Sequence, residues 1–523
     1  MLAFNQIIDT YSRITPSKIV INNESKKLSY KKLKINGTNL AFFLKKIGIT
    51  KGDRVALLAY NCIEYAETLY ATSKIGAIIV PINFRLDSHE IIALWNDAKP
   101  KCLVFQEYFS KVYYELVRKK LIRKKQCIAI SKSENDFNCN LYYKILKNKI
   151  SSIVKLKQNS KPEDIWSLMY TSGTTGTPKG VARNHSAYYI LSSITAIELS
   201  IKKEDMALLV MPLCHANSFN FFCAYIFSGA SVCIYSKKSF DPEFFFKLIK
   251  NFRCTFTSLV PTHYIILLEY IKKNKNMEKY KIENNFSFMI SSAPVRSDTK
   301  KDILKYFNNA RLFELYGSSE SGWVTMLHPS DQLSRLGTVG KECVGSKPIL
   351  ILNEKKKEVK DQKIGELYAS TPYNFSFYWN SPSKTKKAFF NDYVTVGDLA
   401  YRTKDGYIKL VDRKKNMIIS GGENIYPAEV ENVLGNHKKI NDIAVIGDAD
   451  KKWGEIVCAF VVLKEGCHIS EKDLINWAKS KLARYKCPKR VIFINHNQMP
   501  RNATGKVLHK ELKIMIKKYK NNE

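Results

Sequence analysis

Residues 170–180 combine glycine, hydroxyl and lysine side chains in one short segment, Tyr-Thr-Ser-Gly-Thr-Thr-Gly-Thr-Pro-Lys-Gly. Glycine lets a backbone turn tightly enough to direct several N–H groups at one anion. Hydroxyl groups can hydrogen-bond phosphate oxygens, and a lysine adds a mobile positive charge. The segment therefore predicts a loop that wraps a polyphosphate. The residues expected to bind the phosphates are Thr171, Ser172, Gly173, Thr174, Thr175, Gly176 and Lys179.

Apolar runs at residues 165–170 and 181–183 flank this loop and predict two strands. A Walker-type phosphate loop needs a lysine followed by Ser or Thr at the start of a helix. Here Lys179 is followed by Gly180, and no helix is expected, so the Walker interpretation fails. The alternative is a solvated linker, which seldom lies between two apolar runs.

A second group of chemically capable residues follows the predicted strand at 311–315. Tyr316 can stack on a purine, and Gly317 lets the backbone approach a ligand closely. Ser319 supplies a hydroxyl, and Glu320 offers a hard oxygen ligand to Mg²⁺. A third segment, residues 500–506, ends in Gly-Lys and places Lys506 near the carboxy end of the chain.

Together the three segments resemble the motifs of the adenylate-forming superfamily, which contains acyl-CoA synthetases, firefly-type luciferases and peptide-synthetase adenylation domains. The resemblance runs from residue 28 to residue 512 and is greatest to fatty-acid and related acid–CoA ligases. It implies an ATP-dependent ligase that converts an apolar carboxylate, with a fatty acid favoured, into an acyl adenylate. The acyl group then passes to the thiol of CoA, and AMP is released. The co-substrates implied are ATP, Mg²⁺ and CoA.

The resemblance also assigns roles to single residues. Lys506 is the catalytic lysine, expected to bridge the carboxylate and the α-phosphate. Glu320 and Thr171 are expected at the metal ion. Asp398, which we expect to end a strand at 395–398, suits the ribose hydroxyls, as a carboxylate does in dinucleotide sites. Arg413 also reaches the ribose in the family, after a hairpin whose turn contains Asp-Gly.

A predicted acyl pocket follows the strand that ends at His215, within a Met-Pro-x-x-His motif. The resemblance makes this histidine a residue that lines or gates the pocket, although such a histidine is also common in an ordinary core. The other pocket residues expected are Phe219, Gly317 and Trp323. By the resemblance, the helix that carries Phe219, Phe221, Phe222 and Tyr225 forms one wall of the pocket. Plain core packing is the alternative for each aromatic side chain. Ser292 is expected near the adenine, where Ser291 and Ser292 depart from the Gly-Ala that is frequent in the family.

Strands that alternate with helices predict an α/β fold. We expect a large N-terminal adenylation domain at residues 1–414, built from α/β subdomains and a β-rich, barrel-like part. A small mobile α+β domain is expected at residues 415–523, with the hinge near Lys415. Pro427 is expected to begin a helix in this domain, and Gly435 to end it. In the family, Gly421 and Gly422 border the tunnel for the pantetheine arm of CoA, whereas the residues alone are equally consistent with a plain turn.

Composition restricts the class of protein. The net charge is +36, and the lysines are spread along the chain, so a solvated surface is favoured over a nucleic-acid site. Peripheral contact with anionic membranes stays open. Residues 207–236 lack charged side chains but contain Pro, His, Asn and Gly, which favours a buried core over a membrane span. The 12 cysteines show no zinc spacing and no signal peptide is evident, so we expect reduced thiols and a cytoplasmic enzyme.

Three other functions remain open from the sequence. An acyl-AMP ligase that loads a carrier protein would use the same first half-reaction, although no inserted segment is evident between Glu320 and Asp398. A basic nucleic-acid-binding protein on a nucleotide-binding fold is disfavoured by the intact set of motif residues. Luciferase-like oxygenation is compatible with the same scaffold. The oligomeric state does not follow from the sequence.

Overall fold

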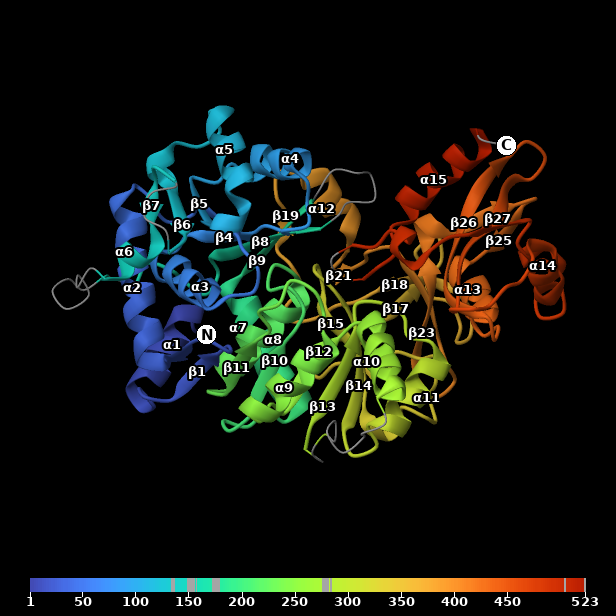
Figure 1. Ribbon diagram of the computed structural model, residues 1–523, viewed down its shortest axis with the longest axis horizontal. Coiled ribbons are helices and arrows are strands. Elements are labelled where there is room, and N and C mark those ends of the chain that lie inside the picture. Colours follow the sequence, from blue (N-terminus) through green and yellow to red (C-terminus); the bar gives the residue numbers. More distant parts are fainter. Residues whose placement is uncertain are drawn as a thin grey trace.

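Figure 1 shows the chain as a computed structural model, with a large layered body and a smaller part formed by the carboxy-terminal residues. The structure describes residues 1–132, 137–147, 156, 158–171, 179–274, 282, 285–502 and 505–521. Helices and strands alternate through most of the body, as predicted from the sequence. The predicted α/β class, with a small carboxy-terminal α+β part, is confirmed.

The first sheet has eight strands in the order β19-β9-β8-β4-β3-β5-β6-β7, and its central strands are parallel. Its strands are β3 (Arg54–Leu58), β4 (Ile78–Pro81), β5 (Cys102–Gln106), β6 (Cys127–Ile130), β7 (Asn140–Leu141), β8 (Ile165–Thr171), β9 (Lys179–Asn184) and β19 (Phe377–Tyr378). Apolar runs form these strands because both faces of the sheet are covered. The antiparallel pair β8 and β9 brackets the predicted phosphate loop.

The second sheet has nine strands in the order β16-β15-β14-β13-β12-β10-β11-β1-β2. Its strands are β1 (Ile19–Asn22), β2 (Lys27–Ser29), β10 (Met206–Leu209), β11 (Ser231–Ile234), β12 (Phe256–Leu259), β13 (Ser287–Ser291), β14 (Arg311–Ser318), β15 (Gly322–Leu327) and β16 (Lys341–Glu342). Strands β10 to β14 are parallel, so their carboxyl ends lie at one edge. Ligands bind at this edge in open α/β sheets.

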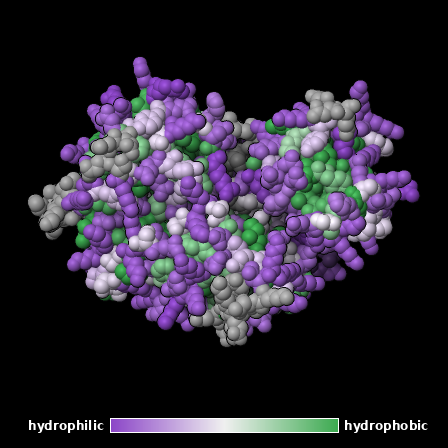
Figure 2. Space-filling view, viewed as in Figure 1, coloured by the Kyte–Doolittle hydropathy of each residue, from purple (hydrophilic) through white to green (hydrophobic). Residues whose placement is uncertain are grey.

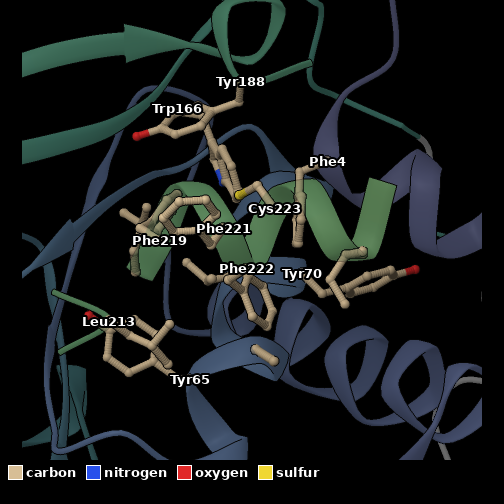
Figure 3. Close-up of a cluster of buried hydrophobic side chains, with 14 of the residues drawn as sticks. Phe4, Tyr65, Tyr70, Trp166, Tyr188, Leu213, Phe219, Phe221, Phe222 and Cys223 are labelled. Atoms are coloured by element: carbon tan, nitrogen blue, oxygen red, sulfur yellow. The ribbon is translucent and has the colours of Figure 1, made fainter. Parts of the chain in front are cut away.

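Helices pack against both sheets. They are α1 (Phe4–Ile14), α2 (Tyr30–Lys46), α3 (Ile63–Ile75), α4 (Ser88–Ala98), α5 (Ser110–Arg118), α6 (Tyr142–Lys147), α7 (His185–Leu199), α8 (Ala216–Phe227), α9 (Pro242–Phe252), α10 (Pro261–Lys273) and α11 (Ser297–Tyr306). The largest buried cluster joins side chains of α1, α3, α7 and α8 to residues of both sheets. Figure 3 shows α8 at its centre, where Phe219 and Phe222 point to different sides of the helix.

The β-rich section after residue 349 forms a four-stranded antiparallel sheet in the order β17-β18-β22-β23. Its strands are β17 (Leu350–Leu352), β18 (Gly365–Tyr368), β22 (Asp398–Arg402) and β23 (Ile408–Arg413), and beside it lie α12 (Pro382–Ala388), β20 (Phe389–Phe390) and β21 (Tyr393–Val394). The prediction that Asp398 ends a strand is wrong, because Asp398 begins β22. Gly397, with a φ of +79°, turns the chain after β21 and separates the two strands.

The carboxy-terminal part contains a five-stranded sheet with helices against it. Its elements are β24 (Ile418–Ser420), β25 (Glu423–Ile425), α13 (Pro427–Gly435), β26 (Ile440–Asp450), β27 (Gly454–Leu463), α14 (Glu471–Lys479), β28 (Arg490–Phe493) and α15 (His509–Asn521). A short 3₁₀ helix, η6 (Lys414–Asn416), connects β23 to β24 and contains Lys415, the predicted hinge residue. The helix predicted from Pro427 to Gly435 has these bounds.

Two further predictions concern burial. The uncharged stretch 207–236 forms β10, α8 and β11 inside the core, as predicted. None of the helices in the described ranges has the length and apolar character needed to cross a membrane. All 12 cysteines are free thiols, and most of them are buried, as predicted.

Candidate active site

A carboxylate, a phenol and a guanidinium meet where β14, β22 and β23 come together. The register pairs Asp398 with Arg413, whose Nε lies 2.9 Å from Asp398 Oδ1. The Tyr316 hydroxyl donates a 2.7 Å hydrogen bond to Asp398 Oδ2. Burial, together with the nearby Asp398, raises the pKa of Tyr316, so its hydroxyl keeps the proton that it donates. The three side chains thus form a fixed polar group. The carboxylate and guanidinium suit the hydroxyls of a ribose, and the Tyr316 ring suits a purine.

The second motif forms the end of β14 and the turn to β15. A Cβ atom at Gly317 would lie 2.1 Å from the carbonyl oxygen of Gly322, so this position admits only glycine. Ser319 and Glu320 lie in the turn. Tyr378 donates a 2.7 Å hydrogen bond to Glu320 Oε1, and Arg183 donates a 2.9 Å hydrogen bond to the Ser319 carbonyl. Tyr378 therefore orients the buried Glu320 carboxylate, while Arg183 fixes the backbone of the turn that carries it.

Three lysines gather beside this group. Burial, followed by the charge of Arg413, lowers the pKa of Lys506 to about 8. The same two causes lower the pKa of Lys415 to about 8, and Lys179 contributes a further repulsion. The ammonium group of Lys179 lies 4.9 Å from the centre of the Tyr378 ring. Like charges held this close favour an anionic ligand, because an anion relieves their repulsion.

Lys506 belongs to the carboxy-terminal part, yet its loop touches the large body. A Cβ atom on the neighbouring Gly505 would lie 3.3 Å from Val260 Cγ2 and 3.5 Å from Thr262 Oγ1. The Arg85 guanidinium donates a 3.4 Å hydrogen bond to the Asn502 carbonyl. Figure 2 shows a notch between the two parts of the molecule, and these contacts bridge the two parts. The structure thus brings Lys506 close enough to Asp398 for the two charges to interact.

The predicted acyl pocket is only partly assembled as expected. His215 lies at the amino end of α8, and burial lowers its pKa to about 4, so the imidazole is neutral at physiological pH. Phe219 is fully buried against Trp166 and Tyr188, in the core (Figure 3). Phe221, two residues later, is the ring that packs against Trp323, with 5.0 Å between their centres. Both residues belong to the helix that we predict to form one wall of the pocket, and of the two it is Phe221 that contacts Trp323.

The remaining predicted residues have separate positions. Ser292 follows β13 in the left-handed region, with a φ of +70°, a strained conformation of the kind that clusters at functional sites. Thr171 ends β8 and pairs with Lys179. Gly421 and Gly422 form the turn between β24 and β25, and Trp453 lies against Gly421. The predictions for Ser172, Gly173, Thr174, Thr175 and Gly176 fall outside the described residues.

Comparison with known proteins identifies the chain. Residues 9–379 match the AMP-binding enzyme family, and residues 429–506 match the AMP-binding enzyme C-terminal domain. The chain belongs to the AMP-binding enzyme family. It is an AMP-forming acid–CoA ligase, and enzymes of this kind use ATP, Mg²⁺ and CoA.

Relatives of the ligase differ in the acid that their names give. The chain is 30% identical to the long-chain-fatty-acid–CoA ligase FadD13 of Mycobacterium tuberculosis, over 92% of each chain. It is 29% identical to the indoleacetate–CoA ligase of Aromatoleum aromaticum, over 98% of each chain. The structure of the Bacillus subtilis o-succinylbenzoate CoA synthetase MenE, in complex with ATP and magnesium ion, superimposes with a TM-score of 0.83. That comparison has 25% identity and covers 97% of this chain and 99% of the other.

The residues of the ligase fit a magnesium ion that is shared with the nucleotide. Within the part of the chain that the structure describes, no group of three or more His, Cys, Asp or Glu side chains could hold a metal ion. Mg²⁺ is commonly bound by one or two carboxylates together with substrate phosphates, so the single oriented Glu320 is sufficient. Bound there, Mg²⁺ would neutralise part of the phosphate charge.

Sequence reasoning missed two residues that position the site. Tyr378 lies 58 residues from Glu320, and nothing local in the sequence connects them. Arg183 did carry a signal, because an arginine in an apolar strand needs a partner. It is buried in β9, and its guanidinium donates to the carbonyls of Ser319 and Glu320.

Proposed function

We propose that the ligase activates a fatty acid or a related, mostly apolar carboxylic acid and transfers the acyl group to CoA. The observation that carries the roles of its residues is the convergence of Lys506, from the small part, with Arg413, Lys415 and Lys179 around Asp398. These four cations outnumber the three carboxylates that act on them, Asp398, Asp412 and Glu320, and a net positive charge suits a nucleotide polyphosphate. The domain boundary at Lys415 forms part of the same proposal, with η6 as the hinge.

The first half-reaction joins two anions. A carboxylate oxygen attacks the α-phosphorus of ATP, the bond to the bridging oxygen of the β-phosphate breaks, and pyrophosphate leaves. Repulsion between the carboxylate and the phosphate raises the barrier, so cations placed at the developing charge stabilise the transition state. Lys506 bridges the carboxylate and the α-phosphate, and Lys179 contacts the outer phosphates. Asp398 and Arg413 hold the ribose, while Tyr316 and Ser292 border the adenine.

The second half-reaction needs space for a thiol. The sulfur of CoA attacks the acyl carbonyl, the carbonyl-to-phosphate oxygen bond breaks, and AMP leaves, while the thiol proton passes to solvent. Lys506 occupies the approach to the nucleotide in the present arrangement, so the small part rotates about η6 and removes it. The turn at Gly421 and Gly422 then borders the channel for the pantetheine arm.

Two observations support a mostly apolar acyl group. The rings of Phe221, Phe256 and Trp323 form a continuous wall on α8, β12 and β15. The indole N–H of Trp323 donates a 2.8 Å hydrogen bond to Thr195, so this ring is fixed in place. FadD13, a relative of similar length, is a ligase of long-chain fatty acids.

The test is ATP–pyrophosphate exchange with a panel of carboxylic acids, followed by addition of CoA. We expect exchange that requires both ATP and a suitable acid, and thioester formation only after CoA is added. Exchange with arylacetic or succinylbenzoic acids, and none with fatty acids, would replace the fatty-acid assignment. Absence of exchange with every acid would contradict the proposal.

A further inference from the structure

Helix α8 carries two buried asparagines whose hydrogen-bonding capacity is not met. Asn217 Nδ2 donates hydrogen bonds to Ser291 Oγ at 2.7 Å and to Ser258 Oγ at 3.1 Å. Its Oδ1 is buried and has no hydrogen-bond partner among the described residues. Asn220 is fully buried, and neither its Oδ1 nor its Nδ2 has a partner in the described part of the chain.

The spacing of these residues places Asn220 beside the candidate active site. Asn217, Asn220 and Cys223 recur every three residues and so lie along one face of the helix. At one end of this face, Asn217 reaches Ser291, the last residue of β13. At the other end, the Cys223 thiol interacts electrostatically with Arg183, which donates to the carbonyls of the Ser319–Glu320 turn. Asn220 therefore lies between these two ends.

The same helix also supplies the apolar wall. Phe221, the residue after Asn220, packs against Trp323 and Phe256 (Figure 3 shows Phe221 and Cys223 on α8). Adjacent residues of a helix project about 100° apart, so an acyl group that contacts both Phe221 and the face of Asn217 and Cys223 meets the Asn220 amide between them. A buried amide without a hydrogen-bond partner costs free energy, so a substrate that supplies the partner binds in preference to one that does not.

The occupant that fits is neutral and both donates and accepts a hydrogen bond. An amide with both ends unpaired needs one acceptor and one donor, whichever way its oxygen and nitrogen are assigned. A hydroxyl group supplies both. A charged group would be costly here, because Asn220 is fully buried and Arg183 already donates to two carbonyls.

We propose that Asn220 selects acids whose acyl group carries a hydroxyl substituent, so that the preferred substrate is a hydroxylated acid and not the unsubstituted one. This inference rests on the proposed function, since it concerns the acyl pocket of the same ligase. Ser258, Ser291 and Asn217 act as positioning residues that fix the start of α8. A site built to bind a hydroxyl rejects the analogue that lacks it, because its amide is then left unpaired.

The experiment compares matched pairs of acids in ATP–pyrophosphate exchange. Each pair is an unsubstituted acid and its hydroxylated form, taken from straight-chain acids with the hydroxyl at successive carbons and from phenylacetic acid with a ring hydroxyl. We expect at least one hydroxylated acid to exceed its parent by about tenfold or more in kcat/KM. The inference is overturned if every unsubstituted acid has a kcat/KM equal to or above those of its hydroxylated forms. The proposed function is then still intact. No exchange with any acid overturns the proposed function itself.

A variant assigns the preference to its residue. Asn220→Leu replaces the amide by an apolar side chain, and we expect it to abolish or invert the preference while the best unsubstituted acid is still activated. The matched control is Asn39→Leu on α2, because Asn39 is also a buried asparagine with an unpaired Oδ1 and lies outside the site. A preference that survives in Asn220→Leu contradicts the assignment. If that variant does not fold, the comparison of acid pairs in the unaltered ligase still decides.

Discussion

Single side chains set the charge balance of the site, and Lys506 is the clearest case. We predict that Lys506→Ala lowers the rate of adenylate formation by about 100-fold to 1,000-fold, because one preorganised contact to the transition-state charge is lost. Thioester formation from supplied acyl-AMP is expected to change little. Both half-reactions are measured by rapid quench. Lys510→Ala, at an exposed lysine in α15, serves as the control. Equal losses in both half-reactions would remove the assigned role.

The pKa values of the lysines predict a pH dependence. Lys506 acts as a cation, and with a pKa of about 8 it is protonated below that pH. The kcat/KM for ATP in pyrophosphate exchange should therefore fall as the pH rises through about 8. Lys415→Met removes a neighbouring positive charge, which raises the pKa of Lys506 and moves this fall to higher pH. A fall that stays in place, or moves to lower pH, would contradict the charge coupling.

The sequence predicted that most of these residues lie near one another, because residues of one short motif stay adjacent in the fold. Tyr316, Gly317 and Glu320 are close in sequence, and β14 with its turn keeps them close in space. The contact from Tyr378 to Glu320 could not be predicted, since it depends on β19 pairing with β9. Which of the predicted aromatic residues of α8 contacts Trp323 could not be predicted for a similar reason. Neighbouring aromatics on a buried helix look alike in sequence, and only the packing of α8 fixes which one faces Trp323.

At the level of secondary structure, the bulge where β14 pairs with β15 constrains the site most tightly. The register shifts between Tyr316 and Gly317, and a Cβ atom on Gly317 would collide with the Gly322 carbonyl. We predict that Gly317→Ala destabilises the fold by about 1–3 kcal/mol, measured by urea denaturation, and raises the KM for ATP. Gly435→Ala at the end of α13 is the control, because a Cβ there meets its nearest atom at 3.4 Å. Similar stability losses in both variants would contradict the steric argument.

The bounds of elements were predictable where local chemistry fixes them. Pro427 at the first helical position and Gly435 at the end gave the correct bounds of α13. Residues 111–158 gave no clear prediction of helices or strands, because abundant lysine hides the hydrophobic periodicity. Even so, α5, β6, β7 and α6 lie there. Strands β6 and β7 complete the first sheet, and α5 and α6 pack into two different apolar clusters, which are tertiary effects. Asp398 was placed at the wrong end of its strand because a turn at Gly397 was not recognised.

For the whole molecule, the sequence could not place the carboxy-terminal part against the body. The Lys506 loop contacts Val260 and Thr262, and Arg296 approaches α13, where its guanidinium lies 3.4 Å from a Cβ built on Gly435. These contacts join segments distant in sequence and leave no local pattern. In the proposed function they assemble one nucleotide site from both parts. If Lys506 acts as proposed, this arrangement makes the adenylate and a different one makes the thioester.

A reversible cross-link tests that requirement most directly. Arg296→Cys and the exposed position Asn436→Cys, beside Gly435, are joined by a bifunctional thiol reagent with a photocleavable spacer. We predict that the cross-linked ligase keeps ATP–pyrophosphate exchange near the level of the unlinked variant, while thioester formation falls by about 100-fold and returns on cleavage. If the cross-linked enzyme carries out both half-reactions at unchanged rates, the rotation about Lys415 and the two-state role of Lys506 are both contradicted.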